Sequence, residues 1–252
     1  MKRIKAGTSF MEACIHCDGL LRTATIRPRA DLKSLLRRVM STDGVISALA
    51  IAAPLIFLFL PLVGIFLWLI SIAALCSYYF LIIDHVARGR DGLPTTSDAL
   101  DDWWTIMGHA FRGFTCFLLT IVPTIAWVYF SDSPIVDLIY SPMLRLFLLV
   151  IPLLYLPAAI VAMNMTESTL LGLWPVTWIR IVVTAPSAYL RLVGLVAASM
   201  VALWLGNLVA AHTLGMLPLL GTMLVASVTN LLLLAQAAIV GGFLHDNAGE
   251  FR

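Results

Sequence analysis

The chain has little charge, and what it has is unevenly distributed. Only 12% of its 252 residues are charged and 61% are hydrophobic, whereas a soluble domain carries about 25% charged residues. The stretch Val45–Ile83 contains no charged side chain at all. This composition excludes an ordinary soluble domain and predicts a protein that crosses a membrane several times.

Cysteine is also scarce, with four residues and no disulfide framework. Cys14-Ile15-His16-Cys17 has the spacing of one zinc knuckle, but tetrahedral zinc needs four ligands and no second pair follows in the polar part of the chain. Two copies of the chain would supply four thiolates. A redox pair and a knuckle that holds no metal are the alternatives. We therefore expect no cofactor, with zinc at Cys14 and Cys17 as the open alternative.

Charged side chains are missing where a pump or an enzyme needs them. No Asp, Glu, Lys or Arg lies near the centre of any expected span, which argues against a proton-driven pump or a voltage sensor. No His-Glu-x-x-His helix, catalytic triad or Gly-rich phosphate loop occurs in its required context. We therefore expect that the protein is not an enzyme.

The uncharged stretch Val45–Ile83 is too long for one crossing. As a helix it would measure about 58 Å, whereas the hydrocarbon core of a bilayer is about 30 Å thick. Pro61 and Gly64 lie near its middle and can break a helix and turn the chain. We interpret the stretch as a transmembrane hairpin. A similar motif predicts a second hairpin turn at Pro218 and Gly221, with chance similarity as the alternative.

The apolar stretches together predict an all-α polytopic membrane domain over residues 45–245, with about six transmembrane helices arranged as three hairpins. The first stretch crosses twice and the others once each: Phe114–Phe130, Leu144–Met163, Leu192–Ala211 and Leu217–Leu244. A basic cytoplasmic arm over 1–44 precedes this domain, and a short cytoplasmic tail over 246–252 follows it.

Three segments predict amphipathic helices on the membrane surface. In residues 30–40, Leu32, Leu35, Leu36 and Val39 recur at helical spacing between basic side chains; a solvated basic flank is the alternative. In residues 98–111, apolar side chains that include two tryptophans form a stripe along one face of the expected helix. Residues 166–187 are too interrupted for a clean span and are the third such segment. We expect residues 1–29 to lack regular structure.

Basic residues indicate the orientation of the chain. Nine of the sixteen Lys and Arg precede residue 40, and the segments 84–113, 164–191 and 245–252 hold six more. With the N-terminus inside, only Arg145 falls outside these inner segments. We therefore expect a multi-pass protein of the bacterial inner membrane with cytoplasmic termini. The basic arm predicts contact with anionic lipids and gives no reason to expect nucleic acid.

Two groups of polar residues are candidate functional sites. Asn207, Asn230 and Gln236 lie inside expected spans and serve either as a polar path or as hydrogen-bonding groups between helices. Asp84, His85, Asp98 and His245 lie at the inner ends of spans, where they form either a functional cluster or simple polar caps.

Several short motifs resemble a known family. They are Leu60-Pro61-Leu62-Val63-Gly64, Tyr78-Tyr79, Arg88-Gly89 and Leu93-Pro94. The pattern is similar to a family of uncharacterised bacterial multi-pass proteins of unknown function, remotely like the Yip-type (Rab-GTPase-interacting) membrane domains. The chain departs from that pattern at Ser77, Thr95-Thr96 and Trp174. The resemblance implies a topology and no activity.

The sequence thus favours a non-enzymatic integral membrane subunit or scaffold, with protein partners or a second copy of itself as binding partners. The alternative is a transporter or channel for a small or lipidic solute. Its path would use Asn207, Asn230 and Gln236, along spans that are interrupted by prolines.

Overall fold

The structure is a computed structural model. It describes residues 2–6, 9–13, 20–24, 31–90, 92–95, 103–130, 142–166, 168–214, 216–217 and 220–247. Everything stated below about the fold concerns these residues.

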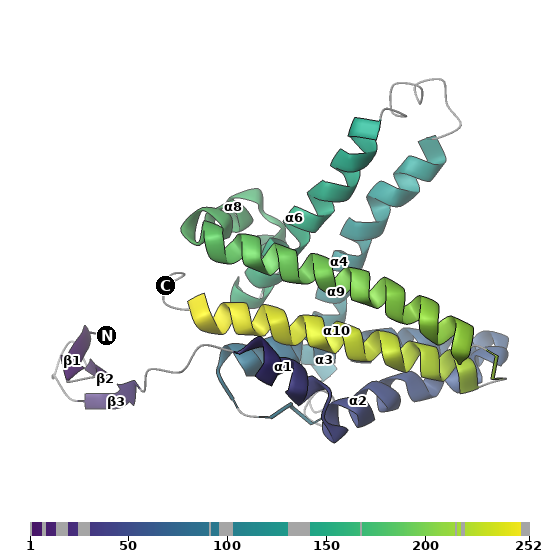
Figure 1. Cartoon of the computed structure of the whole chain (residues 1–252), viewed down its shortest axis with the longest axis horizontal. Helices are drawn as coiled ribbons and strands as arrows, with labels where there is room; N and C mark the ends of the chain where they lie inside the picture. Colours follow the sequence, from purple (N-terminus) through teal and green to yellow (C-terminus); the bar gives the residue numbers. More distant parts are fainter. Residues whose placement is uncertain are drawn as a thin grey trace.

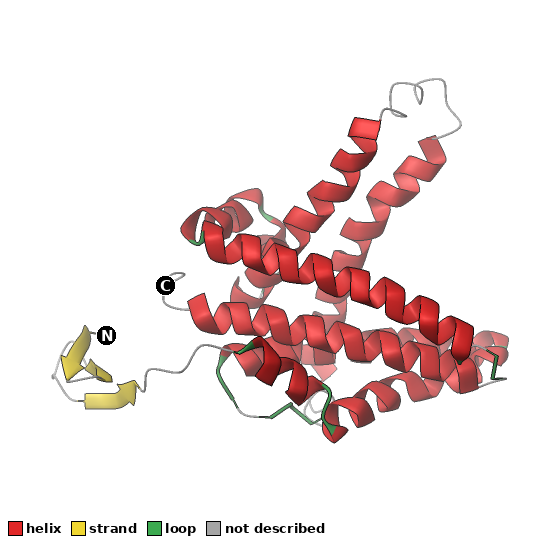
Figure 2. Ribbon diagram, in the orientation of Figure 1, coloured by secondary structure: helices red, strands yellow, loops and turns green. Residues whose placement is uncertain are grey.

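The first described residues form a three-stranded antiparallel sheet (Figure 2). Its strands are β1 (Lys2–Ala6), β2 (Ser9–Ala13) and β3 (Leu20–Ala24). The register places both Arg3 of β1 and Arg22 of β3 opposite Glu12 of β2. The prediction that residues 1–29 lack regular structure is therefore wrong for these strands. Runs of five residues are too short for an alternating pattern to stand out in the sequence.

From Leu32 onward every described element is a helix, which confirms the all-α prediction for this part of the chain (Figures 1 and 2). The helices are α1 (Leu32–Val39), α2 (Thr42–Ala52), the 3-10 helix η1 (Ala53–Phe59), α3 (Pro61–Ala87), α4 (Trp103–Phe130), α6 (Pro142–Thr166), α7 (Thr169–Leu173), α8 (Pro175–Thr184), α9 (Pro186–Thr213) and α10 (Leu220–Asn247).

Three of these helices are long and apolar enough to cross a membrane: Leu62–Ala87, Pro186–Thr213 and Leu220–Asn247. A fourth candidate is the pair Leu32–Val39 and Thr42–Phe57, which is bent by 52° at the break between its two parts. Length and apolar composition of this kind are the properties of a membrane protein.

Proline starts helices in this chain. Pro61, Pro142, Pro175 and Pro186 are each the first residue of a helix, a position where proline loses no hydrogen bond. The residue before a proline is held near an extended conformation, and Leu60 and Trp174 have ψ angles of 109° and 124°. The breaks at these two residues follow directly from the sequence.

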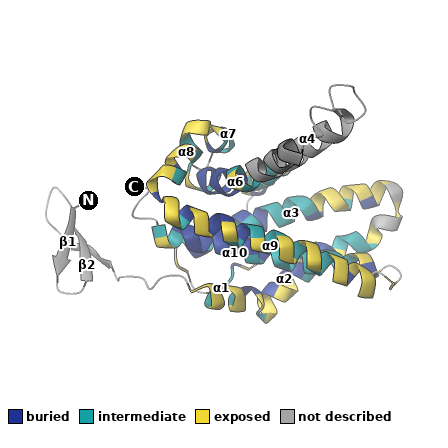
Figure 3. Cartoon of the chain, turned by 45° about the horizontal axis from the view of Figure 1, so that its top comes forward, coloured by how far each residue is buried: buried dark blue, intermediate teal, exposed yellow. Residues whose placement is uncertain are grey.

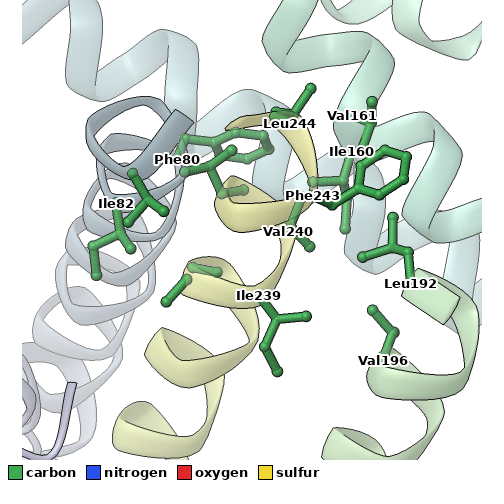
Figure 4. Close-up of a cluster of buried hydrophobic side chains, with 14 of the residues drawn as sticks. Phe80, Ile82, Ile160, Val161, Leu192, Val196, Ile239, Val240, Phe243 and Leu244 are labelled. Atoms are coloured by element: carbon green, nitrogen blue, oxygen red, sulfur yellow. The ribbon is translucent and has the colours of Figure 1, made fainter. Parts of the chain in front are cut away.

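Helix α10 lies at the centre of the bundle and contacts α1, α2, α3 and α9 (Figure 1). From Gln236 to Leu244 every residue of α10 is buried (Figure 3). Side chains of α3, α6, α9 and α10 meet in this core, among them Phe80, Ile160, Leu192 and Phe243 (Figure 4). A helix that is apolar on all sides is expected to be enclosed by others in this way.

The N-terminal half of α3 and the C-terminal half of α9 have exposed apolar side chains. Leu62, Phe66 and Trp68 of α3, and Trp204 and Leu208 of α9, are all exposed. Exposed apolar surface of this extent on a helix is characteristic of contact with lipid or with another protein.

Two of the expected surface helices differ from the prediction. The amphipathic segment over 98–111 is not a separate helix, because α4 continues from Trp103 to Phe130 without a break. No proline lies between Trp103 and Pro123 to stop the helix, and Gly113 is accommodated within it. Residues 166–187 contain two short helices, α7 and α8, instead of one, because Pro175 separates them.

The predicted basic amphipathic helix is present as α1. Leu35 and Val39 are buried, whereas Leu32 and Leu36 are partly exposed. Asp31 caps the helix by accepting a hydrogen bond from the backbone N–H of Lys33 (3.4 Å). The apolar stripe is therefore divided between the protein, chiefly α10, and the exterior.

Candidate functional site: a polar pocket between α3, α4 and α6

A pocket of about 470 Å³ lies where the C-terminal turns of α3 meet the first turns of α4 and the C-terminal turn of α6. Its polar lining residues are Asp84, Arg88, Thr105, His109, Arg112 and Asn164, and its apolar walls include Phe80 and Trp104. Three helices thus converge to bring charged and polar groups together in a chain with few of either. A concave site with a few converging polar groups is the usual form of a ligand site.

The charged side chains among the described lining residues, Asp84, Arg88 and Arg112, sum to one net positive charge at neutral pH. Asp84 accepts a hydrogen bond from Nε of Arg88 at 2.8 Å, one helical turn apart on α3. Such partly exposed i, i+4 pairs contribute about 0.3–0.5 kcal/mol. Arg112 adds the second positive charge of the pocket.

His109 is neutral in this setting. Burial lowers its pKa from 6.5 to about 4, the positive charge of Arg112 acts in the same direction, and Asp84 opposes them. The imidazole ring stacks on Phe80, with a centroid distance of 5.7 Å and an angle of 24°. This contact fixes the ring at the wall of the pocket.

Two side chains that line the pocket have buried polar atoms without a hydrogen-bond partner among the described residues. These atoms are Nδ1 of His109 and Nδ2 of Asn164. Leaving a buried donor or acceptor unpaired costs about 1–3 kcal/mol. Most buried polar atoms in proteins have a partner, so both call for an explanation.

The structure separates the predicted cluster at the span ends. Asp84 lines the pocket, whereas Nδ1 of His245 on α10 lies 3.3 Å from the carbonyl oxygen of Ala87. His85 is not among the residues that line the pocket, and Asp98 lies outside the described residues. Successive helical residues point about 100° apart, so neighbours at one span end face different helices.

The predicted polar residues of the spans bond between helices. Asn207 on α9 accepts a hydrogen bond from the hydroxyl of Thr229 on α10 at 2.5 Å. Asn230 donates its amide to the carbonyl oxygen of Ala48 on α2 at 3.2 Å. Gln236 is buried on α10. Because Asn207 and Asn230 connect α10 to two different helices, their bonds correspond to the helix-packing alternative.

The residues predicted at hairpin turns lie beside helix starts. The break is at Leu60, Pro61 begins α3, and Gly64 lies in the first turn of α3. The N–H of Gly64 donates to the carbonyl of Leu60 at 2.6 Å, and that of Gly221 donates to Leu217 at 2.9 Å. Each of the two similar motifs therefore contains a hydrogen bond from the glycine N–H to the carbonyl four residues earlier, although Pro218 lies outside the described residues.

Tyr78, one of the motif residues, joins three parts of the chain. Its hydroxyl donates to the carbonyl of Pro94 at 2.7 Å and is hydrogen-bonded to Oγ of Ser47 at 3.1 Å. Only 1% of Tyr78 is exposed. Nearby, Nη1 of Arg38 donates to the carbonyl of Arg90 at 3.2 Å. These contacts hold the loop after α3 against α1 and α2.

The predicted zinc ligands Cys14 and Cys17 lie outside the described residues, between β2 and β3. Within the described part of the chain, no group of three His, Cys, Asp or Glu side chains is placed to hold a metal ion. Zinc at the two cysteines stays a prediction.

The sequence analysis did not select Arg88, Arg112, His109 or Asn164 as site residues. Each of them nevertheless lies in a segment that the charge pattern places on the inner side. Arg112 and Asn164 are separated by a long stretch of sequence, so only the packing of α4 against α6 and α3 brings them to one pocket.

Comparison with models of protein families, with curated proteins and with solved structures finds no match to this chain. The pocket and the helix contacts are therefore interpreted from their own chemistry.

Proposed function

We propose that the chain is a bacterial inner-membrane protein with six crossings that serves as a non-enzymatic subunit or scaffold of a membrane assembly. The observation that carries this proposal is the use of the polar span residues. Asn207 and Asn230 hold helices together, which leaves them engaged in packing and not aligned along a solute path. Hydrogen bonds between membrane helices contribute about 0.6 kcal/mol on average.

Helix lengths support six crossings. Helices α4 and α6, with 28 and 25 residues, measure about 42 and 38 Å. Helix α2 and η1 together span about 30 Å, because a 3-10 helix rises about 2 Å per residue. Each therefore reaches across a hydrocarbon core of about 30 Å, as α3, α9 and α10 also do.

The direction of α3 and α10 supports the same topology. Near the C-terminal ends of both, Gly241 packs on Ile83 and Val86, and His245 lies at Ala87, so the two helices run in the same direction (Figure 1). Parallel neighbours need an odd number of crossings between them. Helices α4, α6 and α9 supply three.

The scaffold proposal is tested by purifying the tagged full-length protein from its native membranes in a mild detergent. We expect a second protein to remain bound at a fixed molar ratio across preparations, absent from an unrelated multi-pass protein with the same tag and expression level. A purified protein that is monomeric and alone in every detergent contradicts the proposal.

A second measurement separates a scaffold from a transporter. Asn230→Leu removes the amide that bonds to Ala48, so we expect lower thermal stability and no effect on solute flux in proteoliposomes. Measurable flux that is lost in Asn230→Leu at unchanged stability supports the transporter instead.

A further inference from the structure

The pocket between α3, α4 and α6 contains more hydrogen-bonding capacity than the described part of the chain uses. Nδ1 of His109 and Nδ2 of Asn164 are buried without partners there. The asparagine nitrogen is a donor, and the histidine nitrogen donates in one of its two neutral tautomers. A ligand that accepts hydrogen bonds in the pocket would pair both atoms.

The charges of the pocket favour an anion. Among the described residues that line the pocket are two guanidinium groups, of Arg88 and Arg112, and one carboxylate, that of Asp84, which accepts a hydrogen bond from Arg88 at 2.8 Å. The planar fork of a guanidinium matches the oxygens of a phosphate group. Asp84 opposes an anion, so its pairing with Arg88 is needed for the site to accept one.

The pocket lies one bilayer thickness from the far ends of its three helices. Asp84 is about 35 Å from the start of α3, His109 about 32 Å from the end of α4, and Asn164 about 33 Å from the start of α6, at 1.5 Å per residue. Since the hydrocarbon core is about 30 Å thick, all three reach the depth of the lipid headgroups. This step rests on the proposed membrane topology.

An exposed aromatic side chain marks the same depth. Trp104 lines the pocket and is 81% exposed. Tryptophan is enriched at the boundary between hydrocarbon and headgroups, where its ring contacts lipid and its N–H reaches water. The pocket therefore borders the lipid phase as well as the inner aqueous side.

We propose that this pocket binds a phosphate group, with Arg112 and Asn164 as its principal donors. The phosphate comes either from the headgroup of an anionic phospholipid of the inner leaflet or from a soluble phosphate, which have the same binding chemistry. This assigns a ligand site that is independent of any partner protein.

The test uses the full-length protein in dodecyl maltoside, where topology does not affect access to the pocket. Thermal unfolding is followed during titration with dioctanoyl phosphatidic acid, and its control is dioctanoylglycerol, which has the same chains and no phosphate. A separate titration uses sodium phosphate, with sodium chloride of equal ionic strength as the control. A ligand that binds only the folded state raises the melting temperature, and the rise grows with the logarithm of the ligand concentration once this exceeds the Kd.

We expect dioctanoyl phosphatidic acid to raise the melting temperature and dioctanoylglycerol to leave it unchanged. A matching response to sodium phosphate identifies soluble phosphate as sufficient, and a response to the lipid alone identifies the headgroup. Equal responses to the two lipids, or no response to either phosphate ligand, overturn the proposal.

Two variants test whether the phosphate ligand binds in the pocket. Arg112→Gln is expected to weaken binding at least tenfold, whereas Arg191→Gln, an exposed inner-side arginine on α9, should stay within twofold of the unmodified protein. If Arg112→Gln does not fold, Asn164→Asp decides, because it keeps the side-chain shape and replaces the donor by a negative charge. Unchanged affinity in the variant that folds contradicts the assignment.

Discussion

Tyr78 and Tyr79 are neighbours on α3 with opposite hydrogen-bonding environments. The hydroxyl of Tyr78 bonds to Pro94 and Ser47, whereas the buried hydroxyl of Tyr79 has no partner among the described residues. We therefore expect Tyr78→Phe to lower the free energy of unfolding by about 1–3 kcal/mol, because buried partners lose a hydrogen bond.

Tyr79→Phe is the matched control, since it removes the same atom from the next residue. In the unmodified protein the buried hydroxyl of Tyr79 loses its hydrogen bonds to water and gains none among the described residues in their place. We therefore expect its removal to leave the free energy of unfolding unchanged or slightly higher. Thermal unfolding of both variants in the same detergent compares them directly. Equal losses in the two variants contradict the assigned role of Tyr78.

His109 gives the folded protein a dependence on pH. Its pKa falls from 6.5 to about 4 on folding, chiefly through burial. Between these values the unfolded chain binds the proton more readily, so the stability supplied by neutral His109 is complete above pH 6.5 and is lost as the pH falls toward 4.

We expect the melting temperature of His109→Gln to fall less between pH 7 and pH 4.5 than that of the unmodified protein. His212→Gln, at an exposed position on α9, controls for the removal of one imidazole. The comparison concerns the slope, because loss of the stacking on Phe80 also changes the absolute stability. Parallel slopes for His109→Gln and the unmodified protein contradict the account.

At the scale of residues, sequence reasoning located polar groups but not their partners. Asp84 and His245 were grouped because both lie at inner span ends, yet they serve different contacts. The direction of a side chain around its helix depends on which neighbour packs there. Contacts between distant segments of the chain determine that neighbour, and these contacts cannot be read from the order of residues alone.

Among the elements, the contact between α10 and α3 depends on a glycine. A Cβ at Gly241 would lie 2.8 Å from Cβ of Val86 and 2.9 Å from the carbonyl oxygen of Ile83. In a membrane, helices associate mainly through close packing of this kind. We expect Gly241→Ala to lower the free energy of unfolding by about 1–3 kcal/mol, the usual cost of overpacking.

Gly194→Ala provides the control, since a Cβ on this exposed residue of α9 meets nothing within 4 Å. Alanine is favoured over glycine inside a helix by about 0.8–1.0 kcal/mol, so this variant should be as stable as the unmodified protein or more so. Thermal unfolding or steric trapping measures both. A Gly241→Ala variant as stable as Gly194→Ala contradicts close packing at this contact.

Element boundaries were predictable where proline sets them. The helix starts at Pro61, Pro175 and Pro186 follow from the missing N–H of proline and its effect on the preceding residue. The continuity of α4 was not predicted, because a change from amphipathic to uniformly apolar composition marks a change of surroundings and not a helix end. The strands β1–β3 are too short to carry a distinct pattern.

The helices of the molecule are arranged around α10, which is the last described helix in the sequence. It contacts α1, α2 and α3 from the first part of the chain and α9 directly before it, and its residues 236–244 are all buried (Figure 3). The sequence predicted the apolar stretches and their inner basic flanks. It did not predict that the two helices that follow the motifs at Leu60 and Leu217 pack side by side.

The proposed six crossings follow from the parallel direction of α3 and α10 and from three long helices between them. They place the exposed residues Leu62 on the outer side, and Thr95 and Leu170 on the inner side. Reporter proteins inserted at these three positions read the side of the membrane directly, and exposed positions are the ones that tolerate insertion.

The most direct test is the pair of reporters at Leu62 and Thr95, expressed separately in the same cells at equal levels. We predict that an alkaline phosphatase fusion is active at Leu62 and inactive at Thr95, because α3 crosses the membrane between them. Activity at both positions, or at neither, would contradict the crossing of α3 and with it the arrangement of the whole chain.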